Sequence, residues 1–145
     1  PPTITIFRTF DYSGNQLIAS PRYSFAGTVA YDIPLPGQIA GAGLGVLTPR
    51  FSYSWKDTLL YDACGGRGTR CNFDDEFFAQ KPFWVLNAAL IWNSENEGIS
   101  LTGWVRNLLD NHYKTQSFDL SRGLGVILDV YADPRTYGFT VNISF

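Results

Sequence analysis

The feature that most constrains the fold is an alternation of apolar and polar residues with a period of two. It recurs in five segments, residues 22–33, 46–61, 83–93, 99–106 and 137–145. In the second segment, Phe51, Tyr53 and Trp55 alternate with small polar and basic residues. Successive side chains of a β-strand point to opposite faces, and helical periodicity is nearly absent. The pattern therefore predicts an all-β chain of five strands, each with one apolar and one polar face.

The charged residues in and beside these segments share the polar parity. They are Arg22, Asp32, Arg50, Lys56 and Arg106. A charge that faces lipid at mid-depth costs roughly 2–4 kcal/mol, whereas one that faces a wet lumen costs little. The apolar parity ends in aromatic residues, as at Trp84 and Trp92, which is typical of the aromatic girdles of membrane barrels. We therefore expect an antiparallel transmembrane β-barrel.

The connections between the segments alternate in length. Residues 34–45 and 94–98 form short turns, and residues 62–82 and 111–134 form long connections rich in charge and glycine. Short turns at one end and long loops at the other are the layout of an outer-membrane barrel. A soluble β-sandwich would also explain the alternation, but its strands are usually shorter than residues 46–61. Pro49 and Trp104 fit the barrel less well, and a β-bulge would account for either.

Composition excludes several other classes. No apolar run is long enough for a transmembrane helix, and no Lys/Arg cluster supports nucleic-acid binding. His112 is the single histidine, so neither a catalytic triad nor a zinc site is suggested. We expect no enzyme activity, no cofactor and no metal site.

The long connections contain the candidate ligand contacts. Cys64 and Cys71 flank a Gly/Arg-rich stretch and are expected to form a disulfide, with two free thiols as the alternative. Basic and acidic side chains there could meet an anionic ligand or a cation, with solvated loop residues as the alternative. The candidates are Arg67, Arg70, Asp74, Asp75, Glu76 and Arg122. The apolar stretch 124–134 either packs against neighbouring loops or forms a wall of a ligand vestibule.

Four segments resemble those of known families. The final ten residues, TYGFTVNISF, resemble the terminal strand of outer-membrane barrels, which the barrel-assembly machinery reads through its alternate apolar positions. These positions are Tyr137, Phe139, Val141, Ile143 and Phe145. More specifically, GWVRNLLDNHY (103–113) is similar to the penultimate-strand signature of TonB-dependent receptors, with Arg106, Asn107 and Asp110 at its centre. Residues 12–25 and 47–57 are similar to further segments of that family.

This resemblance implies the carboxy-terminal part of a barrel of about 22 strands. Residues 1–145 would be about five of those strands, within a longer polypeptide that also has a plug domain. Such receptors lie in the bacterial outer membrane and take up ferric siderophores, vitamin B12 or carbohydrates. The partners implied are outer-membrane lipid, the energy-coupling protein TonB, the barrel-assembly machinery and a small ligand. Phe145 would be periplasmic and the long connections extracellular. A passive porin-like channel and a soluble β-sandwich binding module are the alternatives.

Overall fold

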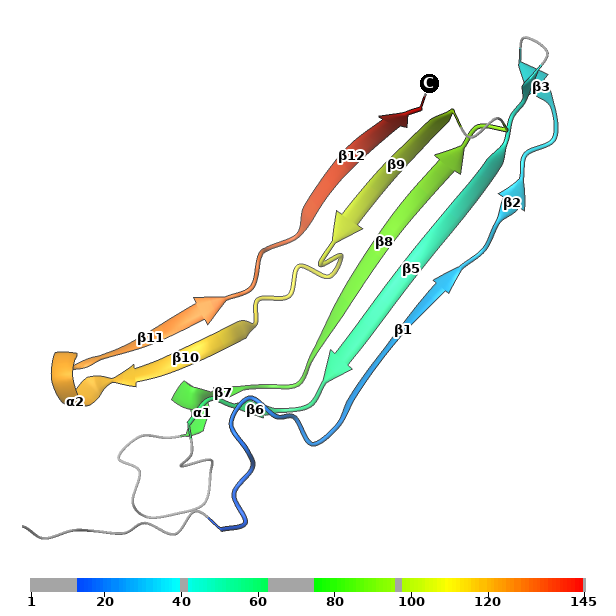
Figure 1. The fold of residues 1–145 in the computed structure, drawn as a ribbon. Helices are drawn as coiled ribbons and strands as arrows, with labels where there is room; N and C mark the ends of the chain where they lie inside the picture. The colour runs from blue at the N-terminus through cyan, green and yellow to red at the C-terminus, as the bar shows by residue number, and fades with distance from the viewer. Residues whose placement is uncertain (1–12, 40–41, 63–74, 96–97, 145) are drawn as a thin grey trace, which may run out of the picture.

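Five long strands form one antiparallel sheet in a computed structural model of the chain, which describes residues 13–39, 42–62, 75–95 and 98–144. The strands are β1 (Ser24–Ala30), β5 (Val46–Lys56), β8 (Phe83–Asn93), β9 (Ile99–Arg106) and β12 (Thr136–Ile143). Each pairs with the strand that follows it in this order, so the sheet is a simple meander (Figure 1). The all-β, antiparallel prediction and the positions of all five strands are confirmed.

The register places the alternating residues on two distinct faces. Along one row, Phe51 pairs with both Val29 and Ala88, and Ala88 also pairs with Val105. No register shift occurs between neighbouring strands of this sheet. The residues of that parity, including Phe25, Trp55, Trp84, Leu90 and Phe139, form what we call the apolar face. Those of the other parity, including Arg50, Ser52, Asn87, Trp104 and Arg106, form the polar face.

Pro49 is accommodated without the bulge that we considered. It stays in register opposite Leu90 on β8. Its carbonyl oxygen accepts a hydrogen bond from the Tyr31 amide at 3.2 Å. The carbonyl and the nitrogen of a strand residue point to the same neighbouring strand, so the missing N–H of Pro49 is on the side of β1. Pairing on that side is interrupted after Ala30 and resumes in β2 (Ile33–Pro34). A proline removes one ladder bond, and here the cost is a break in the neighbouring strand.

Trp104 also keeps the regular register, so the bulge considered there is absent as well. It pairs with Gly138 on β12, and its indole lies over this glycine so closely that a Cβ at position 138 would overlap the ring. An aromatic side chain that covers a glycine on the next strand is a known way to pin a register. Trp104 is therefore a half-buried residue of the polar face rather than an exception to the alternation.

The long connections are extended hairpins. Beyond β5 and β8, β6 (Leu59–Leu60) pairs with β7 (Ala79–Gln80), which follows the short helix α1 (Asp75–Phe78). Beyond β9 and β12, β10 (Lys114–Leu120) pairs with β11 (Val126–Tyr131), and α2 (Ser121–Leu124) joins them. The sequence predicted residues 111–134 as a long connection and did not identify the two strands within it. Pairing there is less regular than in the main sheet, since the register shifts between Lys114 and Gln116.

At the opposite end the two short connections contact each other. The turn after β8 is closed by the Ser94 amide, which donates to the Ile99 carbonyl at 2.9 Å. The Trp92 indole N–H donates to the Leu44 carbonyl at 2.7 Å. The Glu95 carboxylate accepts from the Gly43 amide in β4 (Ala42–Gly43), which pairs with β3 (Gln38–Ile39). These contacts tie the turn after β8 to the tip of the first hairpin.

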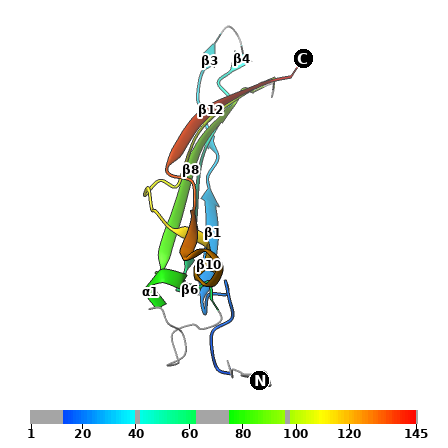
Figure 2. The ribbon, with the colours of Figure 1, turned by 90° about the vertical axis from the view of Figure 1, so that its left-hand side faces the viewer.

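The sheet is a single layer. Figure 2 shows it edge-on as one curved sheet that no second sheet covers. No described side chain is fully buried, and the buried apolar residues Leu59, Phe78 and Phe83 lie at the long-connection end. By contrast, Val29, Leu90 and Phe139 on the apolar face are 62%, 50% and 66% exposed. A β-sandwich would bury such a face against a second sheet, and the described residues supply none. Among the described residues no helix is long and apolar enough to cross a membrane.

Candidate functional site: the polar face and its corner

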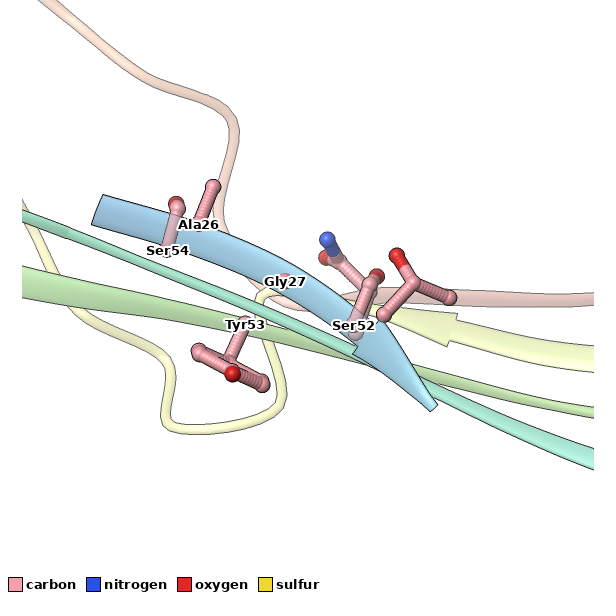
Figure 3. Close-up of a pocket in the computed structure, with 7 residues that line it drawn as sticks. Ala26, Gly27, Ser52, Tyr53 and Ser54 are labelled. Atoms are coloured by element: carbon pink, nitrogen blue, oxygen red, sulfur yellow. The ribbon is translucent and has the colours of Figure 1, made fainter. Parts of the chain in front are cut away.

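Three hollows on the polar face meet at Asn87. The first, of about 410 Å³, is lined by small residues of β1 and β5. Figure 3 shows Ala26, Ser52 and Ser54 on one side of the sheet and Tyr53 on the other. The second, of about 280 Å³, lies between Arg50, Trp104 and Arg106. The third, of about 400 Å³, lies beside the corner where β9 ends. The residues that line each hollow come from at least three strands, which only the register brings together.

The third hollow contains the aromatic residues of the long-connection end. Tyr113 and Tyr131 line it together with Arg106 and Asp133. The Tyr113 ring stacks on Phe83, with ring centroids 4.2 Å apart. Burial, and secondarily the negative charge of Asp133, raises the pKa of Tyr113 above its ordinary value. Tyr113 therefore stays protonated at neutral pH, and this part of the hollow offers neutral aromatic surface beside one positive and one negative side chain.

A polar corner centred on Asn107 joins the sheet to the β10–β11 hairpin. Asn107 is only 5% exposed and has a φ of 50°. Its amide donates to the Asn87 side-chain oxygen at 3.0 Å. Its side-chain nitrogen donates to the carbonyls of Asn111 (3.0 Å) and Asp133 (3.2 Å), and its side-chain oxygen accepts from the Asn111 amide at 3.1 Å. Asparagine tolerates this left-handed conformation better than other non-glycine residues, and here it links three chain segments.

Asp110 and Asn111 complete the corner. Asp110, with a φ of 54°, accepts a hydrogen bond from the Arg135 amide at 2.8 Å. Asn111 donates from its side chain to the Trp84 carbonyl at 2.7 Å. The RNLLDN sequence thus holds the start of β8 and the start of β12 against the end of β9. Of the motif residues, Asn107 and Asp110 make the structural contacts, and Arg106 projects onto the polar face, where its guanidinium carbon lies 5.0 Å from the centroid of the Trp104 ring.

Lys114 links the two long hairpins. Its amide donates to the Gln80 side-chain oxygen at 2.7 Å, and its carbonyl accepts from the Tyr61 hydroxyl at 2.6 Å. Its ammonium donates to the Phe77 carbonyl at 2.9 Å and pairs with Asp129 at 2.8 Å. Burial would raise the pKa of Asp129, but hydrogen bonds from Lys114 and Ser117 and the charge of Lys114 outweigh it and hold that pKa below its ordinary value. Asp129 is therefore ionised at neutral pH and holds the Lys114 ammonium in place.

The structure describes only some of the ligand contacts that were predicted from the sequence. Cys64, Arg67, Arg70, Cys71 and Asp74 lie outside the described residues, so the disulfide and these contacts stay predictions. Asp75 and Glu76 fall in α1, and Arg122 falls in α2 at the distant tip of the β10–β11 hairpin (Figure 1). No group of three or more His, Cys, Asp or Glu that could hold a metal ion occurs within residues 13–39, 42–62, 75–95 and 98–144.

The apolar stretch 124–134 divides into two parts. Tyr131, Asp133 and Pro134 line the third hollow, as a vestibule wall would. Leu124, Val126 and Leu128 instead remain exposed on the hairpin. Sequence reasoning did not single out Asn87, Ser52 or Lys114 as site residues. The polar parity of Asn87 and Ser52 was the available signal, whereas the links made by Lys114 depend on two hairpins that lie far apart in sequence.

A meander of long antiparallel strands with an exposed apolar face, a polar face and extended hairpins at one end defines a sector of a β-barrel wall. No protein-family model matches the sequence, and no curated protein sequence is significantly similar to it. The chain is similar in structure to the ferric yersiniabactin uptake receptor FyuA from Yersinia pestis, with a TM-score of 0.70 and 22% identity. The match covers 92% of this chain and 18% of that receptor, so the chain spans less than a fifth of its length. The chain therefore has the fold of adjacent antiparallel strands in that uptake receptor.

Proposed function

We propose that this chain forms part of the barrel wall of an outer-membrane, TonB-dependent receptor that takes up a scarce ligand, a ferric siderophore. The observation that carries the proposal is the division of one sheet into two faces. The apolar face is covered by no described residue and contains the aromatic cluster of Phe25, Trp55 and Trp84, whose ring centroids lie 5.1–6.5 Å apart. The polar face is hollowed and carries the charges. Lipid on one side and a wet lumen on the other account for both faces.

In this proposal the hairpins at the long-connection end are extracellular and the short turns are periplasmic. The third hollow, with Tyr113, Tyr131 and Arg106, then lies where a ligand would enter the lumen. Arg67, Arg70 and the acidic residues 74–76 remain proposed ligand contacts from the neighbouring hairpin. Coupling to TonB would run through a plug supplied by another part of the polypeptide, and the barrel-assembly machinery would recognise the alternate apolar residues of β12.

The lipid-facing side can be tested with tryptophan fluorescence in vesicles of brominated lipid. Trp84 is 41% exposed on the apolar face, so bromine in the acyl chains should quench it. Trp104 lies on the polar face and should escape. Replacing Trp84 by Phe should therefore lower the quenched fraction of the emission, and replacing Trp104 by Phe should raise it. The two variants serve as matched controls for each other. The opposite signs would place the polar face in lipid and reject the proposed orientation of the wall.

Transport requires a separate experiment in the bacterium that carries the gene. Deleting the gene should abolish uptake of radioactive iron from at least one of a panel of catecholate, hydroxamate and phenolate ferric siderophores. Deleting the gene for TonB should abolish the same uptake, because the transport is energised. Uptake that persists without TonB but is lost with this gene would indicate the passive channel instead. If vitamin B12 or carbohydrate uptake is lost in place of iron uptake, the ferric siderophore is the wrong ligand.

A further inference from the structure

The charges of the sheet are segregated by sign. The chain has 13 acidic residues and a net charge of −2, yet none of its carboxylates lies within the five long strands. The charged residues of those strands are Arg50, Lys56 and Arg106, and the register places all three on the polar face. Two carboxylates lie beside the long strands: Asp57 directly follows β5, and Asp32, between β1 and β2, accepts a hydrogen bond from Thr48 at 2.6 Å. A hollowed surface with one sign of charge attracts the opposite sign.

Two of these cations share one hollow. Arg50 on β5 and Arg106 on β9 both line the hollow of about 280 Å³ together with Ser52, Asn87 and Trp104. Their strands are separated by β8 alone, so their backbones are on the order of 10 Å apart across the sheet. Neither guanidinium forms an ion pair or hydrogen bond with any residue that the structure describes. Each therefore keeps its forked set of N–H donors available for a planar anion.

Trp104 gives the hollow a rigid aromatic wall. Its indole is held against β12 because Gly138, its register partner, has no side chain in the way. The Arg106 guanidinium lies 5.0 Å from the ring centroid, a geometry in which the cation is attracted to the ring and presented beside it. The hollow thus combines two positively charged guanidinium groups with a flat apolar surface. Ser52 and Asn87 add neutral polar groups at its edge.

We propose that Arg50, Arg106 and Trp104 form a binding site for a carboxylate on the polar face of the sheet. The carboxylate has two conceivable sources, a free anion in the lumen or an Asp or Glu side chain from another segment of the same polypeptide. Both would use the same chemistry, bidentate pairing with a guanidinium. This site rests on the proposed function in one respect: the polar face is taken to line the lumen.

Benzoate is a suitable probe for the full-length protein in detergent micelles, with benzyl alcohol as an uncharged analogue. Binding is followed through the emission of Trp104, taken as the difference between the wild type and W104F. Benzoate should change this emission and benzyl alcohol should not. Arg50→Gln and Arg106→Gln should each weaken benzoate binding by about tenfold. Lys56→Gln is the matched control, because Lys56 has the same charge on the same face but does not line the hollow.

An internal carboxylate would give a different but equally specific result. Benzoate would then fail to bind the wild type, and Arg50→Gln and Arg106→Gln would each lower the melting temperature by more than Lys56→Gln does. The proposal is overturned if benzoate does not bind and the three variants melt alike, or if benzyl alcohol binds as well as benzoate whatever the charge at positions 50 and 106. The iron-uptake assay is independent of these results. If deleting the gene leaves uptake unchanged while benzoate still binds, the transport function is rejected and the carboxylate site is retained.

Discussion

Replacing Asn107 by alanine should lower the free energy of unfolding of the full-length protein by about 3–5 kcal/mol. The change deletes three side-chain hydrogen bonds and leaves the carbonyls of Asn111 and Asp133 without this donor at a position that is 5% exposed. Each such loss costs roughly 1 kcal/mol or more. Alanine also tolerates the φ of 50° poorly, which adds about 1 kcal/mol. Equilibrium urea unfolding in lipid vesicles measures the total.

Asn107→Gly separates the two contributions. Glycine adopts a positive φ freely, so this variant should lose the hydrogen bonds but recover the roughly 1 kcal/mol of backbone strain. Both variants should also make the β10–β11 hairpin more sensitive to limited proteolysis than the wild type, because the corner is what holds residues 111–133 to the sheet. A loss under 1 kcal/mol with an unchanged cleavage pattern would show that the hairpin is held by Lys114 and its partners instead.

The sheet itself could be predicted because its determinants are local. The period-two alternation at Phe51, Tyr53 and Trp55 sets which side chains share a face, and neighbouring strands that follow each other in sequence leave one antiparallel arrangement. The strand ends were less accurate. The second strand ends at Lys56 rather than at residue 61, because pairing lapses at Asp57 and Thr58 before it resumes in β6. Alternation continues through such an interruption and cannot mark it.

The site could be predicted only in part, since it depends on contacts between segments distant in sequence. The motif around Arg106, Asn107 and Asp110 was singled out by resemblance, but its bonds to Asn87 and Asp133 follow from the three-dimensional corner. Trp104 was misjudged for a similar reason, since nothing in its own strand indicates that Gly138 lies beneath it. The shared hollow of Arg50 and Arg106 likewise requires the register across β8. Parity identifies a face, and register is needed to identify a site.

A charge on the apolar face should be far more damaging than the same charge one residue away. Leu90 is 50% exposed on the apolar face and Ile91 lies on the polar face; the two are adjacent aliphatic residues of equal size. Leu90→Arg should lower the free energy of unfolding in lipid vesicles by roughly 2–4 kcal/mol, because a guanidinium near the middle of the bilayer is poorly solvated. Ile91→Arg should lower it by about 1 kcal/mol or less, because its side chain would meet a wet lumen. Urea titration of both variants in the same vesicles gives the comparison. Equal losses would mean that both faces meet similar surroundings, and a larger loss at Ile91 would reverse the assignment of lipid and lumen that the proposed function requires.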